Sequence, residues 1–306
     1  MPVGVDYGGT KIEAIVLSDD GEVLAKQRVP TPRGDYDGSV RAIADLVAKV
    51  EAEAGTDPQP MGIGIPGAVG PDGRAFNGNS TWLIGKPLAQ DLTDALDRPV
   101  IAGNDANCFV LSEAIDGAGA GAGAAVVVGA ILGTGVGGAL VVNGRIVNGN
   151  SGMAGEWGHS PLPIARIEEF PGPHCFCGRR GCIEQWLAGP AIEANYARQA
   201  GHVAGEGPRV PEILNLAKEG EARAVEALSL HRDRLGRSLA TVVNLLDPDV
   251  IVLGGGVSNL PGLAEDLPEA MRPYIYSEHS AVRVVRAQFG DSSGVRGAAR
   301  LAAEAI

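Results

Sequence analysis

The chain has 306 residues, of which 45% are hydrophobic and 4% aromatic, and it contains 45 glycines. This length allows one large domain or two ordinary ones, and the glycine content fits an α/β protein with many tight turns. The net charge of −12 argues against a nucleic-acid or anionic-membrane surface, and no run of 18 apolar residues suggests a membrane span. Because the N-terminus lacks a signal-peptide pattern, we expect a cytoplasmic protein with reduced thiols.

The first part of the chain predicts a mixed sheet with helices. A strand over 3–6, a glycine turn over 8–10 and a strand over 11–17 lead into a hairpin signal, Asp19-Asp20-Gly21, and a strand over 22–28. Apolar periodicity predicts helices over 39–54, 88–96 and 106–116, and strands are expected over 61–65 and 100–102.

The same opening pattern returns after the small-residue stretch 117–123. Strands are expected over 124–132 and 136–142, separated by a glycine turn over 133–135, and Asn143-Gly144 predicts a hairpin to a strand over 145–147. Helices over 184–199, 210–218 and 222–246, strands over 249–253 and 282–287, and a closing helix over 293–305 follow. The repeat predicts two related α/β halves, with a small domain over 1–118, completed by a helix over 291–306, and a large domain over 119–290.

Three cysteines lie within eight residues, Cys175, Cys177 and Cys182, in a segment rich in turns. This spacing favours thiolates that converge on one zinc ion, with His174 or His159 as the fourth ligand. The alternative is that these cysteines are free or paired in a disulfide. A zinc ion with four protein ligands is normally structural, so zinc alone does not name a reaction.

Three glycine-rich segments indicate phosphate or nucleotide binding. The first glycine turn offers backbone N–H groups, a hydroxyl and an ammonium group, and Asp6 at its edge is suited to Mg²⁺. The second also matches Gly-x-Gly-x-x-Gly, but a strand follows it instead of a helix, which excludes a dinucleotide-binding Rossmann unit. The third segment, 254–256, follows an apolar strand, and its lack of side chains would let an adenine ring approach the backbone. The candidate residues are Asp6, Gly8, Gly9, Thr10, Lys11, Gly133, Thr134, Gly135, Gly254, Gly255 and Gly256.

Asp105 is the candidate general base, because it follows a strand at the start of a predicted helix. The alternative is that Asp105 only caps that helix. A set of amides and acids is suited to the hydroxyls of a sugar. These candidates are Asn79, Asn104, Glu156, His159 and Glu184. The charges of 231–237 are expected to form a solvated helix face.

These segments, taken in order, resemble the ROK family of bacterial sugar kinases and repressors. The resemblance rests on Asp6–Lys11, Asn104–Asn107, Gly133–Gly138, Glu156–His159, Cys175–Glu184 and Gly254–Gly256 and covers essentially the whole chain. It implies an actin-like ATPase (ribonuclease H-like) fold, in which two related domains close on ATP across a cleft.

The resemblance also implies roles for individual residues. His159, Cys175, Cys177 and Cys182 would hold zinc, with His174 outside the site. Asp105 would be the catalytic base for the 6-hydroxyl of a hexose, and Asn104, Glu156, His159 and Glu184 would bind the sugar. Mg-ATP would lie on the two glycine turns. The family's repressors carry a helix-turn-helix that this chain does not begin with, and family members are often homodimers.

The subfamily pattern looks most like bacterial fructokinases of the manno(fructo)kinase type. It rests on Pro30–Arg33, Asn79–Trp82, Gly155–His159 and Gly290–Gly297. The main prediction is therefore an ATP-dependent fructokinase that forms the 6-phosphate. The alternatives are an N-acetylglucosamine kinase, glucokinase or mannokinase of the same family, or a sugar-sensing regulator without turnover. A zinc hydrolase needs an open metal position, and four protein ligands leave none.

Overall fold

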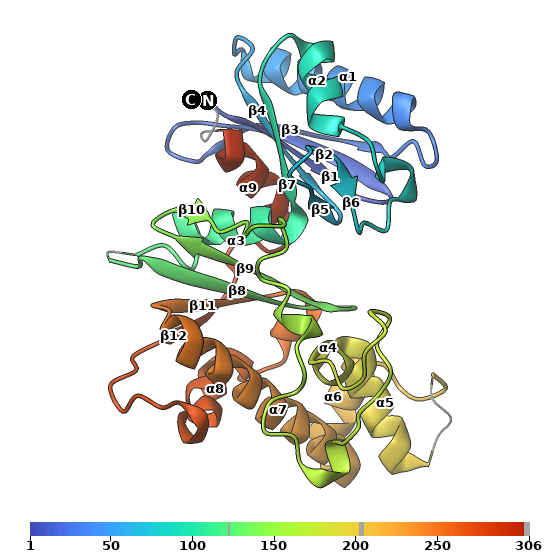
Figure 1. The fold of residues 1–306 in the computed structure, drawn as a ribbon, viewed down its shortest axis with the longest axis vertical. Coiled ribbons are helices and arrows are strands. Elements are labelled where there is room, and N and C mark those ends of the chain that lie inside the picture. Colours follow the sequence, from blue (N-terminus) through green and yellow to red (C-terminus); the bar gives the residue numbers. More distant parts are fainter. Residues whose placement is uncertain (122, 202–204, 303–306) are drawn as a thin grey trace. The chain divides into compact units, whose positions relative to one another are not determined.

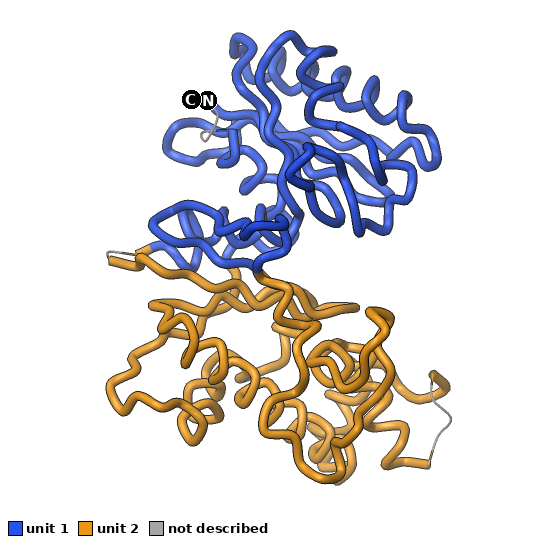
Figure 2. Tube along the Cα trace, in the orientation of Figure 1, with its two compact units in different colours: residues 1–120, 139–154, 288–306 blue, residues 121–138, 155–287 orange. Residues whose placement is uncertain are grey.

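The computed structural model describes residues 1–121, 123–201 and 205–302, and these form two compact units (Figures 1 and 2). The first unit contains residues 1–120, 139–154 and the chain from 288 onward, and the second contains 121–138 and 155–287. The predicted domain boundaries differ mainly in segment 139–154, which we assigned to the large domain. In the structure, β10 of this segment contacts helix α3 of the first unit. Ala122 and the predicted helical residues 303–306 lie outside the described residues.

The first unit is built on a five-stranded sheet in the order β3-β2-β1-β4-β7. β1 pairs antiparallel with β2 and β2 with β3, whereas β4 runs parallel to both β1 and β7. A two-stranded sheet of β5 and β6 stands apart from it. The strands are β1 (Val3–Tyr7), β2 (Lys11–Leu17), β3 (Val23–Pro30), β4 (Met61–Ile65), β5 (Ala68–Val69), β6 (Ala75–Phe76) and β7 (Val100–Asn104).

Helices lie on both faces of this sheet (Figure 1). Helix α1 presents Ile43, Leu46, Val47 and Val50 to the core, as its apolar spacing predicts, and packs with α2 in one hydrophobic cluster. On the other face, α9 contributes Val295 and Ala299 to a second cluster. The helices of this unit are α1 (Tyr36–Ala54), α2 (Leu88–Leu96), α3 (Asp105–Ile115) and α9 (Ser293–Leu301).

Glycines let helix α9 approach the sheet closely. A Cβ at Gly4 would lie 2.3 Å from the carbonyl oxygen of Val295, and one at Gly62 would lie 1.8 Å from that of Ala298. The next layer repeats this feature, because a Cβ at Gly297 of α9 would lie 1.6 Å from the carbonyl oxygen of Cys108 in α3. The C-terminal helix is therefore an integral part of the first unit.

The second sheet has the order β10-β9-β8-β11-β12 and repeats the topology of the first. β10 pairs antiparallel with β9, and β11 runs parallel to both β8 and β12. The repeat predicted from the sequence is thus confirmed, including the hairpin at Asn143 and Gly144, whose φ angles are 50° and 74°. The strands are β8 (Val126–Leu132), β9 (Val136–Val142), β10 (Arg145–Ile146), β11 (Val250–Gly254) and β12 (Arg283–Arg286).

The helices of the second unit group around the long helix α7, which contacts α5, α6 and α8. The predicted helix over 184–199 is two helices, because Ala188 takes an extended backbone between them. Helix α8, which contains Pro268, was not predicted. The helices are α4 (Glu184–Leu187), α5 (Gly189–Ala200), α6 (Val210–Lys218), α7 (Ala222–Leu246) and α8 (Leu263–Met271).

The predicted solvated face over 231–237 is wrong. His231 and Arg237 are only 2% and 1% exposed. Arg234 and Arg237 both donate to the buried carboxylate of Glu169, and Arg237 also donates to the carbonyl oxygen of Ile164. The charges therefore attach the loop 163–169 to α7, because a buried guanidinium must be paired.

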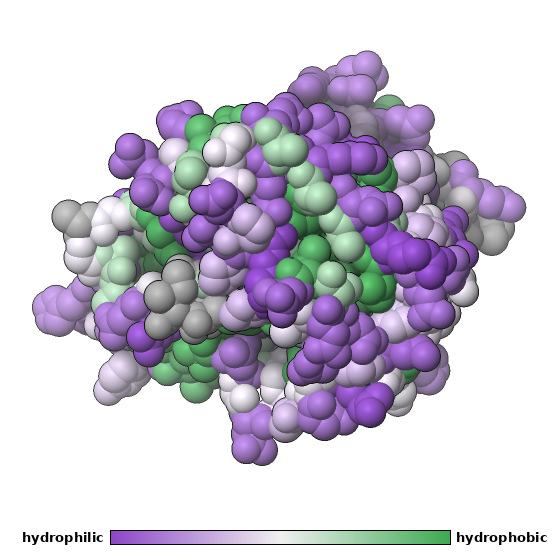
Figure 3. All heavy atoms as spheres, turned by 90° about the horizontal axis from the view of Figure 1, so that it is seen from above, coloured by the Kyte–Doolittle hydropathy of each residue, from purple (hydrophilic) through white to green (hydrophobic). Residues whose placement is uncertain are grey.

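Hydrophilic residues cover most of the face seen in Figure 3, with small hydrophobic patches between them. None of the helices in the described part of the chain has the length and apolar character needed to cross a membrane.

Candidate functional site

The first glycine turn connects β1 to β2 and is held by the chain that follows β3. The amide of Gly8 donates to the carbonyl oxygen of Lys11 at 2.9 Å. Thr31 donates its hydroxyl to the carbonyl oxygen of Gly8 at 2.7 Å, and its amide to that of Thr10 at 3.1 Å. Thr10 and Lys11 remain exposed. The hydroxyl and ammonium groups predicted for phosphate contact are therefore accessible on a fixed turn.

Asp6 is the penultimate residue of the same strand, β1, and lies near a second acid. Burial raises the pKa of Asp6 from its ordinary value to about 6, and the negative charges of Asp105 and Glu13 add to this shift. A buried carboxylate whose pKa is raised by neighbouring negative charges is a site at which a divalent cation is favourable. The residues present thus fit the Mg²⁺ ion that accompanies ATP.

Asn104, and not Asp105, caps helix α3. Asn104 ends β7, and its side-chain oxygen accepts a hydrogen bond from the amide of Asn107 at 3.1 Å. Asp105 is the first helical residue and is exposed. The N-cap is therefore Asn104, while Asp105 accepts the amide hydrogen of Ala106 through Oδ1 at 2.8 Å.

The side-chain nitrogen of Asn104 links the end of strand β7 to the segment that packs against the chain just before Asn79. The side-chain amide of Asn104 donates to the carbonyl oxygen of Gly67. Gly67 has a φ of +88°, and a Cβ there would lie 2.5 Å from the amide of Gly78. Asn79 follows directly and is exposed. The structure thus places Asn79, Asn104 and Asp105 in one neighbourhood of the first unit.

The second glycine turn, in the second unit, is fixed in a similar way. The amide of Gly133 donates to the carbonyl oxygen of Gly135, and the amide of Gly189 at the start of α5 donates to that of Gly133. Gly255 has a φ of +78°, and a Cβ there would lie 2.3 Å from the carbonyl oxygen of Leu132. Two segments predicted for nucleotide contact, 133–135 and 254–256, are therefore neighbours.

The acids predicted for sugar binding surround Val136. Glu184 accepts the amide hydrogen of Val136 through Oε2 at 3.0 Å. The turn that carries Glu156 and His159 lies on the same strand, because Trp157 donates its indole N–H to the carbonyl oxygen of Gly137 at 2.8 Å. A Cβ at Gly158 would lie 2.0 Å from the carbonyl oxygen of Val136, so this close contact requires a glycine. Glu184 and the turn that carries Glu156 are thus both held by contacts with strand β9.

His159, Cys175, Cys177 and Cys182 form a cluster whose ligand atoms all lie within 4.8 Å of one another. The sulfurs of Cys177 and Cys182 are 3.6 Å apart, and Nδ1 of His159 is 3.6 Å from the sulfur of Cys175. His174 is not in the cluster, and its Nε2 lies 2.9 Å from Arg180.

This geometry fits a tetrahedral zinc ion. Zinc–sulfur bonds of about 2.3 Å require sulfur–sulfur separations of about 3.8 Å. Burial raises the pKa of the Cys182 thiol to about 12, and the neighbouring thiols Cys177 and Cys175 add to this shift. A cation at the centre of the cluster is what would keep such a group deprotonated.

Two positions that hold the site were not identified from the sequence. Thr31 contacts the first glycine turn from 23 residues away, and a contact at this distance leaves no local signal. Gly189 precedes a proline at the first turn of α5. A proline is a helix-start signal, so it could have located the start of α5 in the sequence. It carries no information about the contact between Gly189 and Gly133.

Two α/β units with the same sheet order define an actin-like ATPase fold, as expected. The family model described as "ROK family" matches residues 2–305, and the chain belongs to the ROK family. It is 40% identical to an N-acetyl-D-glucosamine kinase of Pectobacterium atrosepticum, over 98% of each chain.

Solved structures give the same assignment. A ROK hexokinase from Thermus thermophilus superimposes with a TM-score of 0.86 at 33% identity, over 100% of this chain and 99% of that one. A ROK glucokinase from Streptomyces griseus, solved in complex with glucose and AMPPNP, has a TM-score of 0.74 at 30% identity, over 99% of each chain.

Proposed function

We propose that this protein transfers the γ-phosphoryl group of ATP to the 6-hydroxyl of N-acetyl-D-glucosamine. That it is a sugar kinase follows from its family and from relatives 39–40% identical over 98% of the chain, in Pectobacterium atrosepticum and Shigella flexneri. Both of these are N-acetyl-D-glucosamine kinases. The predicted fructose specificity receives no support from them, so the alternative from the sequence becomes our proposal.

The observation that carries the chemistry is the acid pair of the first unit beside a glycine turn. Asp105 is exposed at the end of the parallel strand β7, next to a helix cap that does not need its carboxylate. Asp6 lies near enough to Asp105 for the two charges to interact. Phosphoryl transfer to a hydroxyl needs one carboxylate to accept the proton and one to hold the metal ion of the nucleotide.

In this mechanism Asp105 accepts the proton of the 6-hydroxyl. Asp6 holds the Mg²⁺ that enters with ATP, and the first turn supplies Gly8, Gly9, Thr10 and Lys11 to the phosphates. In the second unit, the turn 133–135 and the segment 254–256 would contact the nucleotide. These turns are already held by internal hydrogen bonds, so little reorganisation of their backbone should accompany anion binding.

The sugar hydroxyls are assigned to Asn79, Asn104, Glu156, His159 and Glu184. Glu184 uses Oε2 for the amide of Val136, and a carboxylate has further acceptor sites on Oε1 for a sugar hydroxyl. Zinc would be held by His159, Cys175, Cys177 and Cys182. It would cross-link the turn that carries Glu156 to the segment that precedes Glu184, without taking part in the reaction.

A coupled assay of ADP release tests this proposal. We would compare N-acetyl-D-glucosamine, glucose, mannose and fructose with Mg-ATP, and expect the highest kcat/KM for N-acetyl-D-glucosamine. A preference for glucose or fructose would reject N-acetyl-D-glucosamine as the substrate, while the assignment as a sugar kinase would stand. No turnover with any sugar would reject the kinase itself and favour the regulator.

A further inference from the structure

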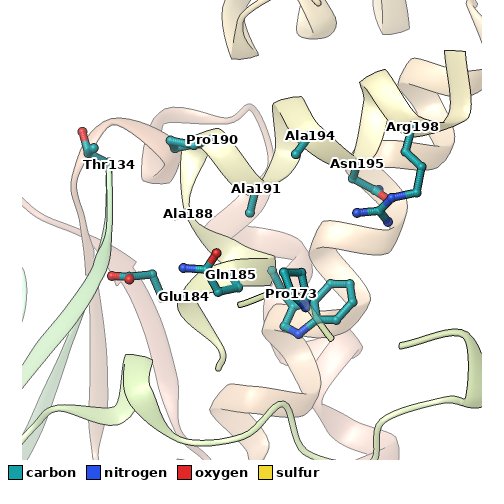
Figure 4. A pocket seen from close by; sticks show the side chains of 11 residues that line it. Thr134, Pro173, Glu184, Gln185, Ala188, Pro190, Ala191, Ala194, Asn195 and Arg198 are labelled. Carbon is teal, nitrogen blue, oxygen red and sulfur yellow. The ribbon is translucent and has the colours of Figure 1, made fainter. Parts of the chain in front are cut away.

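Beneath helix α5 the second unit contains a cavity of about 190 Å³, and of its lining residues the proposed reaction uses only Thr134 and Glu184. Figure 4 shows Thr134 and Glu184 at one end, and Asn195 and Arg198 of α5 toward the other. Small apolar residues line the wall between the two ends, among them Ala191 and Ala194. For comparison, an engineered protein cavity of about 150 Å³ is large enough to bind benzene.

Two residues that line this cavity each carry a buried donor without a partner. Nδ2 of Asn195 and Nε1 of Trp186 make no hydrogen bond within the described part of the chain. These residues are only 7% and 6% exposed, so water does not compensate them freely. A buried donor left unpaired is destabilising, so a ligand that accepts from both would be favoured.

The other two tryptophans both have hydrogen-bonded indole N–H groups, which makes the unpaired N–H of Trp186 unusual in this molecule. The indole N–H of Trp82 donates to the hydroxyl of Tyr7 at 2.7 Å, and that of Trp157 donates to the carbonyl oxygen of Gly137 at 2.8 Å. Of the three tryptophans, only Trp186 has a buried indole N–H without an acceptor, and it is a residue that lines the cavity.

The charges give the ligand its sign and its orientation. Arg198 lies three residues after Asn195 on α5, and its side chain turns back toward Asn195 in Figure 4. No ion pair of Arg198 is found among the residues that the structure describes. The acid of the cavity, Glu184, lies at the opposite end and already accepts the amide of Val136. An anionic group would therefore be attracted to the Arg198 end and repelled from the other.

We propose that this cavity is a binding site for a small oxyanion, a carboxylate or phosphate group on a compact body, held by Trp186, Asn195 and Arg198. The inference uses the second unit alone and does not depend on the proposed function. It also differs from the predicted nucleotide contacts, of which only Thr134 lines the cavity.

The indole N–H resonances of the intact protein test the site directly. With ¹⁵N-labelled protein, three indole signals are expected, and Trp186→Phe identifies one of them while it keeps a ring beneath Arg234. Titration with inorganic phosphate, acetate and N-acetyl-D-glucosamine 6-phosphate should shift the Trp186 signal saturably, and leave those of Trp82 and Trp157 in place. The stronger of the phosphate and acetate responses identifies the anion class.

Variants of arginine separate a specific site from a general charge effect. Arg198→Gln should weaken binding about tenfold or more, because it removes a charge-assisted hydrogen bond. Arg223→Gln, an exposed arginine in the first turn of α7, changes the net charge equally and should leave binding unchanged.

Three results would overturn the proposal. One is a Trp186 signal that none of the three anions moves. Another is equal affinity in Arg198→Gln and wild-type protein. The third is loss of the phosphate response in the presence of AMPPNP, because the cavity would then belong to the nucleotide site.

Discussion

Asn104 and Asp105 are adjacent in the chain but have different roles at the start of helix α3. Asn104 has an extended backbone with φ −65° and ψ 145°, and its side chain satisfies the amide of Asn107. Asp105 follows at the first helical position, near the positive end of the helix dipole. Oδ1 of Asp105 accepts the amide hydrogen of Ala106 at 2.8 Å, and this hydrogen bond orients the carboxylate that is proposed to accept the proton.

We expect Asp105→Asn to lower kcat at least about 10²-fold, because an amide does not accept the proton. The melting temperature should change little, since Asn104 retains the cap. The matched control is Asp97→Asn, an exposed residue with a φ of +51° that asparagine tolerates, and it should retain full activity. Near-normal turnover of Asp105→Asn would remove the residue from the mechanism.

His231 is a second residue whose role depends on burial. Its Nε2 donates to the carbonyl oxygen of Leu187 at 3.0 Å. Burial lowers the pKa of the imidazole from 6.5 to about 4, with Arg234 and Arg232 adding to the effect and the hydrogen bond opposing it. The folded protein therefore contains this histidine in its neutral form.

The lowered pKa of His231 predicts a loss of stability in acid. Between pH 6.5 and 4 the unfolded chain binds a proton at this residue and the folded chain does not, so the free energy of unfolding falls as the pH falls. The loss over that interval is on the order of 3 kcal/mol. His231→Gln keeps a donor for Leu187 without a titrating group, and should lose less stability than wild type between pH 7 and 4 in urea unfolding.

The exposed His279 provides the control for this experiment. His279→Gln removes an exposed imidazole and should follow the wild-type pH profile. Identical profiles for His231→Gln and wild type would contradict the prediction.

At the scale of elements, glycines determine which segments can touch. Gly255 follows β11 with φ +78° and ψ 169°, a backbone conformation that is essentially restricted to glycine. Its backbone lies directly against Leu132, the last residue of β8 before the second glycine turn. The proposed nucleotide segment 254–256 therefore owes its position to one residue without a side chain.

Gly255→Ala should destabilise the protein by roughly 1–3 kcal/mol or more and raise the KM for ATP, because the new Cβ would force the segment away from Leu132. Gly220→Ala is the matched control. Gly220 also has a positive φ, +86°, but a Cβ there would meet nothing within 4 Å. If both variants lower the free energy of unfolding equally and neither changes the KM for ATP, the close contact of Gly255 with Leu132 does not contribute to nucleotide binding.

At the scale of the whole molecule, one sheet topology occurs twice, and the zinc segment belongs to one copy. The proposed zinc ligands come from two places in the chain of the second unit, His159 and the segment 175–182. No strand of the main sheet joins these loops; an isolated bridge pairs Pro161 with Cys182. A bound ion would thus contribute much of the cross-linking in this region.

Removal of zinc should lower the melting temperature and increase hydrogen exchange in 159–187, while β1 and β2 of the first unit stay protected. The measurement is mass-spectrometric exchange before and after chelation, with metal content checked. His159→Gln should lose the metal, and His174→Gln should retain it, since His174 lies outside the cluster. Unchanged exchange in verified metal-free protein would rule out this structural role.

Much of the fold follows from local patterns. Alternating and periodic apolar residues, Asn143-Gly144 and the glycine turns predict the elements and the repeat, because these signals depend on neighbours in the chain. The cysteine spacing likewise predicts a metal cluster. The burial of Arg234 and Arg237 was mispredicted, because their partner Glu169 is 65 and 68 residues away.

The sequence by itself therefore determined the repeated α/β topology, the position of the glycine turns and the candidate acids, all of which depend on short-range periodicity and turn chemistry. Only the tertiary structure decided that Asn104 donates to Gly67, that Glu184 and the Glu156 turn share Val136, and that Trp186 and Asn195 line a cavity with their donors unpaired. These are contacts between segments far apart in the chain. Their energies depend on burial and on which atoms meet, and no local pattern specifies either.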